Sequence, residues 1–557
     1  MTVREERQHP PRRRRNSTSC AFRADPTPPN AKPPCLALPG RVDPSTASTA
    51  STAQATATQG RPVQRFDPNQ LAVRSGHFIH GRLVTGDADA SRDVLRPSDG
   101  QAYAPLPMAE ADLVDQAVDD AYVAWRDGDW ARRPPRERAR VLRRWADLVE
   151  ADAPTLAPLE AVGSTRPVRD ALAWDVPFTA DGLRFFAEYA DKLGGEVAAT
   201  RSDNLGMTIA EPYGVIGAIT PWNFPLVMAS WKVGAALAAG NAVVLKPSEL
   251  TPFSVLRLAE LAVQAGLPAG LFNIVQGDGR VAGAALSRHP RIAKMTFTGS
   301  TSTGAAIMAA CAQHGPKPVT LELGGKSPQL VFDDAPDVER LAGIIAGAIA
   351  GNAGQVCVAG SRLIVQQGIA PALVKAIARR FAAYRPGPTW EDGPTLPPII
   401  SRQQALRIDA IVQRAADAGA TLRGGGPVDD VCGAGAYYLP TLIEGVDAGN
   451  PAVLEEIFGP VLTVQTFATE EEGLALASHP HYGLAAGVHT ADLNRAMRAM
   501  RALSAGTVWI NRYGRSNDFV IPTGGYHQSG IGKDLGRQAV EANQRLKSVL
   551  IDFGSPV

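Results

Sequence analysis

The chain has 557 residues, which is too long for a single small core, so two or more packed units are expected. Its content of 45% hydrophobic and 20% charged residues is typical of a globular enzyme. The formal net charge of +1 provides no general attraction to nucleic acid or to an anionic membrane, so neither is expected as a partner.

Apolar runs and cysteines narrow the class further. Gly, Lys or Asn interrupts the longest apolar segments, so no membrane span is predicted. The cysteines are odd in number and lack the paired spacing of a metal site, which argues against a disulfide framework and against bound metal. They favour a reducing, cytoplasmic location. The five are Cys20, Cys35, Cys311, Cys357 and Cys432.

Residues 1–65 are rich in Pro, Arg, Ser, Thr and Ala, with almost no aromatic residue, and are predicted to be a disordered tail. The run Arg12–Arg15 suggests nucleic-acid contact or a twin-arginine signal, but no apolar region follows it, which disfavours secretion. An organellar transit peptide is a further alternative, which Glu5, Glu6 and Asp25 weaken.

Regular structure is expected to begin near Phe78. Apolar residues recur at helical spacing in Ala111–Trp125 and again in Pro135–Glu150, which predicts two amphipathic helices. Stripes of this kind usually face a core, so we assign them no chemistry.

Short apolar strands then alternate with helices. Uniformly apolar strands form parallel sheets that helices cover on both faces, so a doubly wound α/β architecture is predicted. Ligands of that architecture bind at the carboxyl ends of the strands. The expected strands are Gly214–Thr220, Ala242–Leu245, Phe272–Val275, Ala293–Thr298 and Val319–Leu323, and the expected helices are Leu226–Ala239, Pro252–Ala265 and Ser302–Ala312.

Polar residues lie at the ends of four of these strands. Asn223 lies between two prolines, Lys246 and Glu249 follow the next strand, and Glu322 ends the last. The loop Gly299–Gly304 is not the dinucleotide fingerprint, but its hydroxyls and helix start suit an anion. Each residue alone has an ordinary explanation, such as a solvated strand end or a carboxylate at a helix start. Together at one sheet edge, they favour a binding site.

The segment Gly351–Gly360 places Cys357 among glycines and small residues, where a substrate can approach the sulfur. An unpaired cysteine is more often a small core residue than a nucleophile, so this observation alone does not decide its role.

Six motifs stand in order along the chain: Pro221-Trp222-Asn223-Phe224-Pro225, Lys246-Pro247-Ser248-Glu249, Phe297-Thr298-Gly299-Ser300-Thr301, Leu321-Glu322-Leu323-Gly324-Gly325-Lys326-Ser327, Gly354-Gln355-Val356-Cys357 and Glu455-Glu456-Ile457-Phe458-Gly459-Pro460. Their combination resembles the NAD(P)-dependent aldehyde dehydrogenase superfamily from about Phe78 to Phe553. The resemblance implies an NAD-binding domain (66–195 and 215–323), an α/β catalytic domain (324–535) and oligomerisation strands (196–214 and 536–557) in a homo-dimer or homo-tetramer.

The resemblance also implies roles in catalysis. A thiolate at Cys357 would attack the aldehyde carbonyl, and the oxyanion would be stabilised by the Asn223 amide and the Cys357 N–H. After hydride transfer, Glu322 would act as general base in hydrolysis of the thioester. The implied catalytic set is Cys357, Glu322, Asn223 and Lys246.

The implied cofactor is NAD, with NADP as the alternative. Lys246 and Glu249 would bind the adenosine ribose, Ser300 the pyrophosphate and Glu456 the nicotinamide ribose. A carboxylate at Glu249 would bind a ribose 2′-hydroxyl and repel a 2′-phosphate, which favours NAD. The full implied set is Ile219, Thr220, Pro221, Trp222, Lys246, Glu249, Gly299, Ser300, Thr303, Glu322, Leu323, Glu456 and Phe458.

The segment from Trp509 to Gly530 resembles relatives that oxidise aminoaldehydes, betaine aldehyde or γ-glutamyl-aminobutyraldehyde, so an amino or small aliphatic aldehyde is the expected substrate. Trp222, Trp509 and Tyr513 are candidate faces for a cationic group, while Arg512 would repel an amine or bind a carboxylate. Two departures from the common pattern, Ala350-Gly351 and Pro397, leave the catalytic set intact, but small residues near the sulfur are expected to widen the channel.

Three alternatives stay open. A CoA-acylating enzyme would typically lack the carboxylate at Glu322. A cysteine hydrolase would pair Cys357 with a histidine, and His527 is the candidate, but that hypothesis leaves Asn223, Lys246 and Glu456 without a role. A structural or nucleic-acid-binding protein would be expected to have lost the catalytic residues.

Overall fold

The structure is a computed structural model of the chain, and it describes residues 66–86 and 90–554. The predicted tail, residues 1–65, lies outside the described residues. Both amphipathic helices are confirmed as α1 (Ala111–Asp127) and α2 (Pro135–Ala151). Val114, Ala117, Val118 and Ala121 of α1 are buried, so the apolar stripe faces the core as its spacing predicts.

The first sheet is mainly parallel, as predicted. Its central strands run in the order β9-β8-β7-β10-β11, and all four neighbouring pairs are parallel. Antiparallel strands extend both edges, β1 and β2 beyond β9 and β23 beyond β11. The strands are β1 (His77–Ile79), β2 (Arg82–Val84), β7 (Val215–Ile219), β8 (Ala242–Lys246), β9 (Phe272–Ile274), β10 (Ile292–Thr298), β11 (Val319–Glu322) and β23 (Gly530–Ile531).

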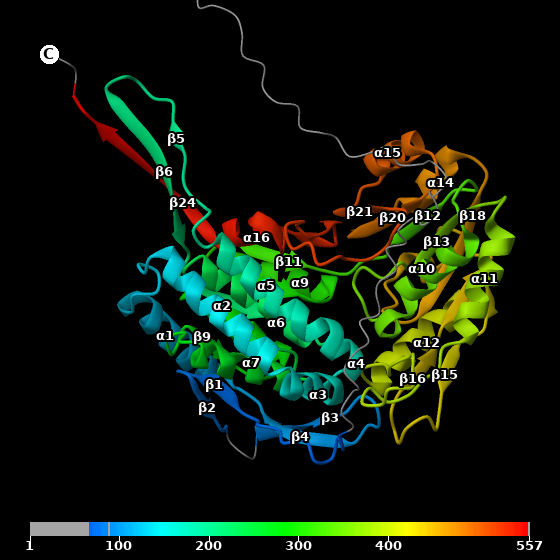
Figure 1. Cartoon of the computed structure of the whole chain (residues 1–557), viewed down its shortest axis with the longest axis horizontal. Helices are drawn as coiled ribbons and strands as arrows, with labels where there is room; N and C mark the ends of the chain where they lie inside the picture. The colour runs from blue at the N-terminus through cyan, green and yellow to red at the C-terminus, as the bar shows by residue number, and fades with distance from the viewer. Residues whose placement is uncertain (1–65, 87–89, 555–557) are drawn as a thin grey trace, which may run out of the picture. The chain divides into compact units, whose positions relative to one another are not determined.

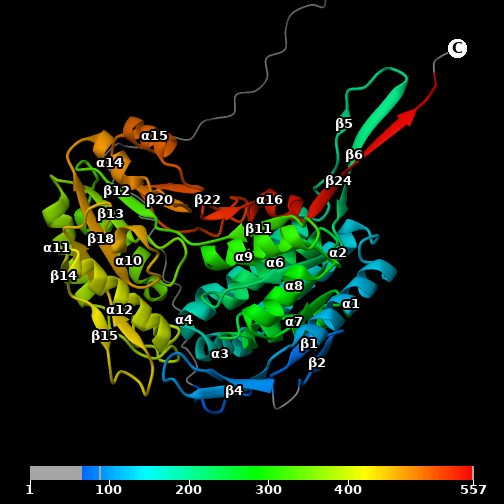
Figure 2. The ribbon, with the colours of Figure 1, turned by 180° about the vertical axis from the view of Figure 1, so that it is seen from behind.

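Helices cover both faces of this sheet (Figures 1 and 2). One layer consists of α2, α3 (Ala153–Gly163), α5 (Val176–Tyr189), α6 (Pro225–Ala238) and α7 (Phe253–Gln264), and the other of α1, α8 (Ala284–Arg288) and α9 (Thr301–Gln313). The chain proceeds from β7 through β8 to β9, and then crosses to β10 on the other side of β7. The point of reversal therefore lies between β7 and β10, where a doubly wound sheet opens a crevice at its carboxyl ends.

A second parallel sheet follows in the chain, with the order β14-β17-β18-β13-β12-β20-β21 and one antiparallel strand, β14, at its edge. In β13, Leu363 and Val365 belong to the core beneath α10 and α11, while Ile364 belongs to the core on the opposite face. Burial on both faces explains why the three central residues of this strand are all apolar. The bounds are β12 (Pro328–Val331), β13 (Arg362–Gln366), β14 (Thr421–Arg423), β17 (Thr441–Glu444), β18 (Val461–Phe467), β20 (Ala485–His489), β21 (Thr507–Ile510), α10 (Val338–Ala350), α11 (Ala370–Ala382), α12 (Arg402–Asp417), α14 (Glu470–Ala477) and α15 (Leu493–Ala502).

A third, antiparallel sheet joins β6 (Asn204–Pro212) to β5 (Val197–Ala198) and to β24 (Gln544–Asp552). Its strands extend away from the helices of the first sheet in both ribbon views (Figures 1 and 2). Ile209, Leu546, Leu550 and Phe553 are exposed on it. An exposed apolar sheet with open edges suits pairing with another chain.

Short elements complete the described chain. They are β3 (Ser91–Leu95), β4 (Ala102–Pro107), β15 (Gly426–Val428), β16 (Tyr437–Leu439), β19 (Tyr482–Gly483), β22 (Tyr526–His527), α4 (Val168–Asp170), α13 (Pro451–Leu454), α16 (Gly536–Glu541), the π-helical turns η2 (Ala171–Asp175) and η3 (Gly279–Gly283), and the 3₁₀ turn η4 (Gly351–Gly354). Across residues 66–86 and 90–554, every helix is too short or too polar to cross a bilayer.

Candidate active site

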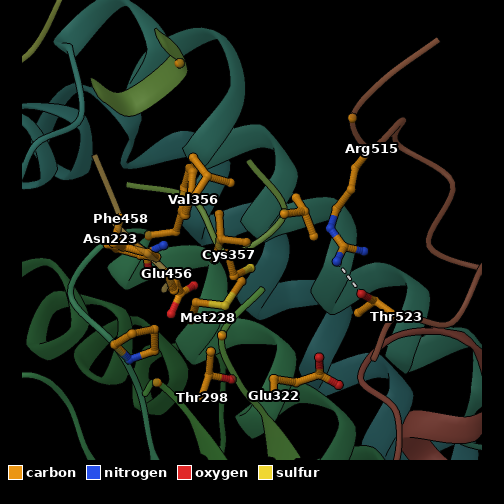
Figure 3. A pocket seen from close by; sticks show the side chains of 18 of the residues that line it. Asn223, Met228, Thr298, Glu322, Val356, Cys357, Glu456, Phe458, Arg515 and Thr523 are labelled. Carbon is orange, nitrogen blue, oxygen red and sulfur yellow. Dashed lines mark hydrogen bonds between the residues drawn. The ribbon is translucent and has the colours of Figure 1, made fainter. Parts of the chain in front are cut away.

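A cavity of about 790 Å³ lies where the carboxyl ends of β7, β10 and β11 meet residues that flank the second sheet. Cys357, Asn223, Glu322, Glu456 and Phe458, which lie far apart in the sequence, all line it (Figure 3). The wall also includes Pro221, Trp222, Gly299, Ser300 and Leu323 from the sequence-predicted set.

Cys357 follows a turn that only an unusual backbone can form. Asn352, Ala353 and Gly354 take φ values of 49°, 51° and 72°, three successive left-handed residues. A Cβ on Gly354 would lie 2.1 Å from the carbonyl oxygen of Gly459, so glycine is required there. Left-handed conformations of non-glycine residues persist only where neighbouring structure holds them, and they cluster at functional sites.

Two side chains hold this turn. Gln355 donates from its amide to the carbonyl oxygens of Asn352 (3.0 Å) and Pro398 (3.1 Å), and accepts from the N–H of Ile400 (2.9 Å). The Asn352 carboxamide oxygen accepts a hydrogen bond of 2.8 Å from the Thr165 hydroxyl. These contacts connect the segment before Cys357 to Thr165, which follows α3, and to Pro398 and Ile400, which precede α12.

Burial dominates the chemistry of the Cys357 thiol. It raises the pKa of Cys357 to about 11, while the positive charge of Arg515 and a hydrogen bond from the Val358 N–H act in the opposite direction. The residue nevertheless retains partial exposure, because its sulfur faces the cavity. A thiol with this pKa is protonated at neutral pH, so forming the nucleophile requires a base.

Asn223 is placed beside Cys357 by the turn between Pro221 and Pro225, at the end of β7. The carboxamide nitrogen of Asn223 donates to the backbone carbonyl oxygen of Gln355 (3.0 Å). The backbone carbonyl oxygen of Asn223 accepts a hydrogen bond from the side-chain amide of Asn352 (3.2 Å). A carboxamide carries two N–H groups, so one remains for a ligand. The backbone N–H of Cys357 makes no hydrogen bond within the described part of the chain, and it provides a second donor for the same oxygen.

Glu322 is the last residue of β11 and is 8% exposed. Its Oε1 atom has no hydrogen-bond partner among the described residues. Burial, and next the nearby Asp534, raise the pKa of Glu322 well above its usual range. Asp534 is itself paired with Lys232 at 2.9 Å. A carboxylate with a raised pKa and a free oxygen in a cavity has the properties of a general base.

The predicted adenosine-side residues lie at the next strand, outside the cavity that contains Cys357. Ile219 of β7 pairs with Lys246 of β8. The Lys246 ammonium donates to the carbonyl oxygens of Pro247 (2.7 Å) and Gly277 (2.9 Å) and lies 3.2 Å from the Glu249 carboxylate. Arg92 approaches the other Glu249 oxygen at 3.9 Å. Lys246 does not line the cavity that contains Cys357, and its catalytic role stays a prediction.

The loop after β10 forms the start of α9. The Ser300 hydroxyl accepts from the Thr303 N–H (3.3 Å) and donates to the Thr303 hydroxyl (2.9 Å). Beneath this loop, the hydroxyls of Thr220 and Thr298 are buried without a hydrogen-bond partner in the described chain, at the ends of β7 and β10. Free donors at the start of a 13-residue helix, with unpaired hydroxyls beside them, suit an anionic ligand.

Glu456 enters the cavity from the opposite side. Its Oε1 accepts a hydrogen bond of 3.0 Å from the Gly325 N–H, and a Cβ on Gly324 would lie 2.3 Å from its Oε2. Burial raises its pKa to about 7. The Phe458 ring meets the Trp222 ring edge to face, with centroids 5.3 Å apart.

Several residues that the sequence did not single out support these groups. Gln404 and Arg407 of α12 bind the backbone carbonyls of residues 456–458. Asn352 and Gln355 hydrogen bond to Asn223, and Asp534 pairs with Lys232. Of these residues, only Gln355 belongs to one of the six sequence motifs, two positions before Cys357. Only the residues immediately before Cys357 offered a signal, because they interrupt a helix.

The expectations for the substrate end need correction. Arg512 is exposed, donates to the Gly514 carbonyl oxygen (3.2 Å) and does not line the cavity, whereas Arg515 does. Tyr513 lines the cavity, but its hydroxyl donates to the Val358 carbonyl oxygen (2.8 Å). Trp509 packs on Tyr513 behind the wall, with centroids 4.7 Å apart. Gly351 lines the cavity, while Ala350 is buried.

His527 does not lie beside Cys357. It forms a 2.8 Å hydrogen bond with Ser504 and lines a separate cavity of about 150 Å³. The Cys–His pair of the hydrolase alternative is therefore not formed.

Comparisons with known proteins agree with this geometry. The chain is 40% identical to the NADP/NAD-dependent aldehyde dehydrogenase PuuC of Escherichia coli, over 87% of this chain and 97% of that protein. It is 42% identical to a betaine aldehyde dehydrogenase of Cereibacter sphaeroides, over 86% of this chain and 98% of that protein. A mutant of the indole-3-acetaldehyde dehydrogenase AldA of P. syringae, solved with NAD⁺ and IAA, superposes with a TM-score of 0.85 at 40% identity, covering 87% and 98% of the two chains.

The family model described as the aldehyde dehydrogenase family matches residues 84–549, most of the chain. With the relatives above and the arrangement of cysteine, carboxamide and carboxylate around one cavity, this match places the protein: the chain belongs to the aldehyde dehydrogenase family.

Proposed function

We propose that the protein oxidises an aldehyde to the carboxylic acid with NAD as hydride acceptor. The single observation that carries this proposal is the shared cavity, in which a nucleophile, two oxyanion donors and a base are found together. A relative named for betaine aldehyde and a solved structure named for γ-glutamyl-γ-aminobutyraldehyde support an amino or small aliphatic aldehyde as the substrate class.

Cys357 is the proposed nucleophile. Its thiol loses a proton and the sulfur bonds to the aldehyde carbon, which converts the carbonyl oxygen into an oxyanion. The free N–H of Asn223 and the backbone N–H of Cys357 stabilise that charge. When bound, the nicotinamide supplies the hydride acceptor, and loss of hydride leaves a thioester on Cys357.

Glu322 is the proposed base for the second half of the reaction. Its carboxylate, which lines the cavity, takes a proton from water as the water attacks the thioester, which frees the acid and restores the thiol. Before that, the same carboxylate can accept the Cys357 proton, which it then releases to solvent so that it is free to act as base again. The raised pKa of Glu322 matches both tasks, because a carboxyl with its ordinary pKa would hold a proton weakly at neutral pH.

The residues fit a dinucleotide. Lys246 and Glu249 suit hydroxyls of the adenosine ribose, Ser300 and the start of α9 suit the pyrophosphate, and Glu456 suits the nicotinamide ribose. Glu249 favours NAD over NADP, although Lys246 and Arg92 beside it reduce the repulsion of a 2′-phosphate. We therefore propose NAD as the better cofactor and NADP as the poorer one.

Cys357→Ala tests the nucleophile. Native protein with NAD and small aldehydes is expected to produce NADH, and the alanine variant, still folded and still binding NAD, is expected to produce none above background. Persistent NADH formation by that variant would remove Cys357 from the mechanism.

The CoA-acylating alternative is disfavoured by Glu322, because a base next to the thioester promotes hydrolysis. Addition of CoA is expected to leave NADH formation unchanged and to yield no acyl-CoA by mass spectrometry. Acyl-CoA as the main product would reverse this assignment.

Assembly and domain division are proposals of the same kind. We propose that residues 66–195 and 215–323 bind the cofactor, that 324–535 carry the nucleophile, and that the strands within 196–214 and 536–557 join subunits of a homo-dimer or homo-tetramer. The exposed apolar residues of β24 support this. The free cysteines Cys311, Cys357 and Cys432 fit a reducing location such as the cytoplasm.

A further inference from the structure

The cavity contains a guanidinium that no carboxylate neutralises at short range. Arg515 lies on the loop after β21, and Figure 3 shows its side chain directed toward Thr523 and the interior of the cavity. It hydrogen bonds to the Thr523 hydroxyl and lies over the Trp231 ring, 5.3 Å from the centroid. Within the described residues, no carboxylate oxygen lies within 4.0 Å of it.

Three buried cations of the described chain have close partners that the half-buried Arg515 lacks, although the buried Lys326 ammonium also has no hydrogen-bond partner there. Lys232 is paired with Asp534 and Arg166 with Asp175, each at 2.9 Å. Arg362 has no carboxylate partner, but three backbone carbonyls within 2.9 Å accept its hydrogen bonds. Leaving a guanidinium without such partners in a desolvated site is costly, unless a ligand provides the missing negative charge.

The cavity beside Arg515 has room for a chain between two functional groups. Gly347 and Gly351 line it, and a Cβ at either position would meet no atom within 4 Å. Trp174, Met228 and Trp231 supply an apolar wall. The same cavity thus has a place for the aldehyde carbon at the Cys357 sulfur, an apolar stretch and the cation of Arg515.

Building on the proposed function, we propose that Arg515 binds an anionic group of the substrate, so that the preferred aldehydes also carry a carboxylate. A guanidinium matches a carboxylate in both charge and planar, two-point geometry. The same charge repels an ammonium group, so aldehydes with a free amine at this end of the cavity are disfavoured. This inference therefore keeps aldehyde oxidation but replaces the amino aldehyde of the substrate class proposed above by an aldehyde that carries a carboxylate.

A competing role for Arg515 is to act on the reacting groups themselves, since its charge lowers the pKa of Cys357 and of Glu322. That role would affect every aldehyde equally. Substrates of equal chain length separate the two roles, because only carboxylate binding by Arg515 would make an aldehyde with a carboxylate a better substrate than a neutral aldehyde.

The experiment measures kcat/KM with NAD for two pairs of aldehydes, succinic semialdehyde against butanal and adipic semialdehyde against hexanal. In the native enzyme, kcat/KM for at least one of the two semialdehydes is expected to exceed kcat/KM for its neutral partner by roughly tenfold or more. In Arg515→Gln that ratio is expected to fall to near one, mainly through KM, and Arg515→Lys is expected to restore part of it. Arg512→Gln, which alters the exposed arginine outside the cavity, is the matched control and is expected to keep the native ratio.

The outcomes are distinct. If neutral aldehydes are oxidised but carboxylates are not favoured, or if Arg515→Gln lowers both members of a pair equally and shifts the pH profile, this inference is overturned while the proposed function stands. If the folded native protein forms NADH with none of the tested aldehydes, neutral or carboxylate-bearing, both this inference and the proposed function are overturned.

Discussion

Replacing Gly354 by alanine is expected to destabilise the turn before Cys357, whereas Gly351→Ala is expected to be nearly neutral. Gly354 has a φ of 72° and its added Cβ would lie 2.1 Å from the Gly459 carbonyl oxygen, while an added Cβ at Gly351, with a φ of −54°, meets nothing within 4 Å. Left-handed strain costs about 1–3 kcal/mol and an overlap about 1–3 kcal/mol more, so the loss is roughly 2–6 kcal/mol.

The overlap also has a functional consequence, because the obstructing atoms belong to the backbone and cannot rotate away. Gly459 follows directly after Glu456, Ile457 and Phe458, so relief of the clash moves the proposed nicotinamide end together with Cys357. Heat unfolding monitored by circular dichroism is expected to show a midpoint about 2–6 °C lower for Gly354→Ala. Its KM for NAD is expected to rise. Equal midpoints and equal KM values for the two variants would refute this reasoning.

Three further predictions concern chemistry. Glu322→Gln is expected to lower kcat by roughly 10²–10⁴ and to slow the first turnover of NADH as well, because the carboxylate serves both half-reactions, with the solvent-facing Glu455→Gln as control; unchanged turnover would contradict the assignment of the base. The ratio kcat/KM is expected to rise from pH 6 to pH 9, because burial raises the pKa of Cys357 to about 11 and that of Glu322 above its usual range, and both act deprotonated; a flat profile would argue against both. Glu249→Gln is expected to raise the NADP-to-NAD ratio of kcat/KM by roughly tenfold, since one repulsive charge is removed; no change would show that Glu249 does not select the cofactor.

Local patterns were enough to predict most of the first sheet. The strand expected at Ala242–Leu245 is Ala242–Lys246, and the helix expected at Leu226–Ala239 is Pro225–Ala238. Such elements are predictable because apolar periodicity and flanking prolines act over a few residues. The site motifs were equally local, since Asn223 between prolines and Cys357 among glycines need no distant contact to be noticed.

Tertiary structure alone decided which motifs meet. Lys246 and Glu322 both end parallel strands, but β8 lies on the far side of β7 from β11, so Lys246 stands apart from the cavity that contains Cys357 and Glu322. Strand order depends on long-range pairing that no local pattern encodes. Arg512 and Arg515 are three residues apart on one loop, and the path of that loop places only Arg515 in the cavity. The sequence by itself thus predicted a nucleophile and its chemistry, whereas the packing of distant segments decided what surrounds the sulfur.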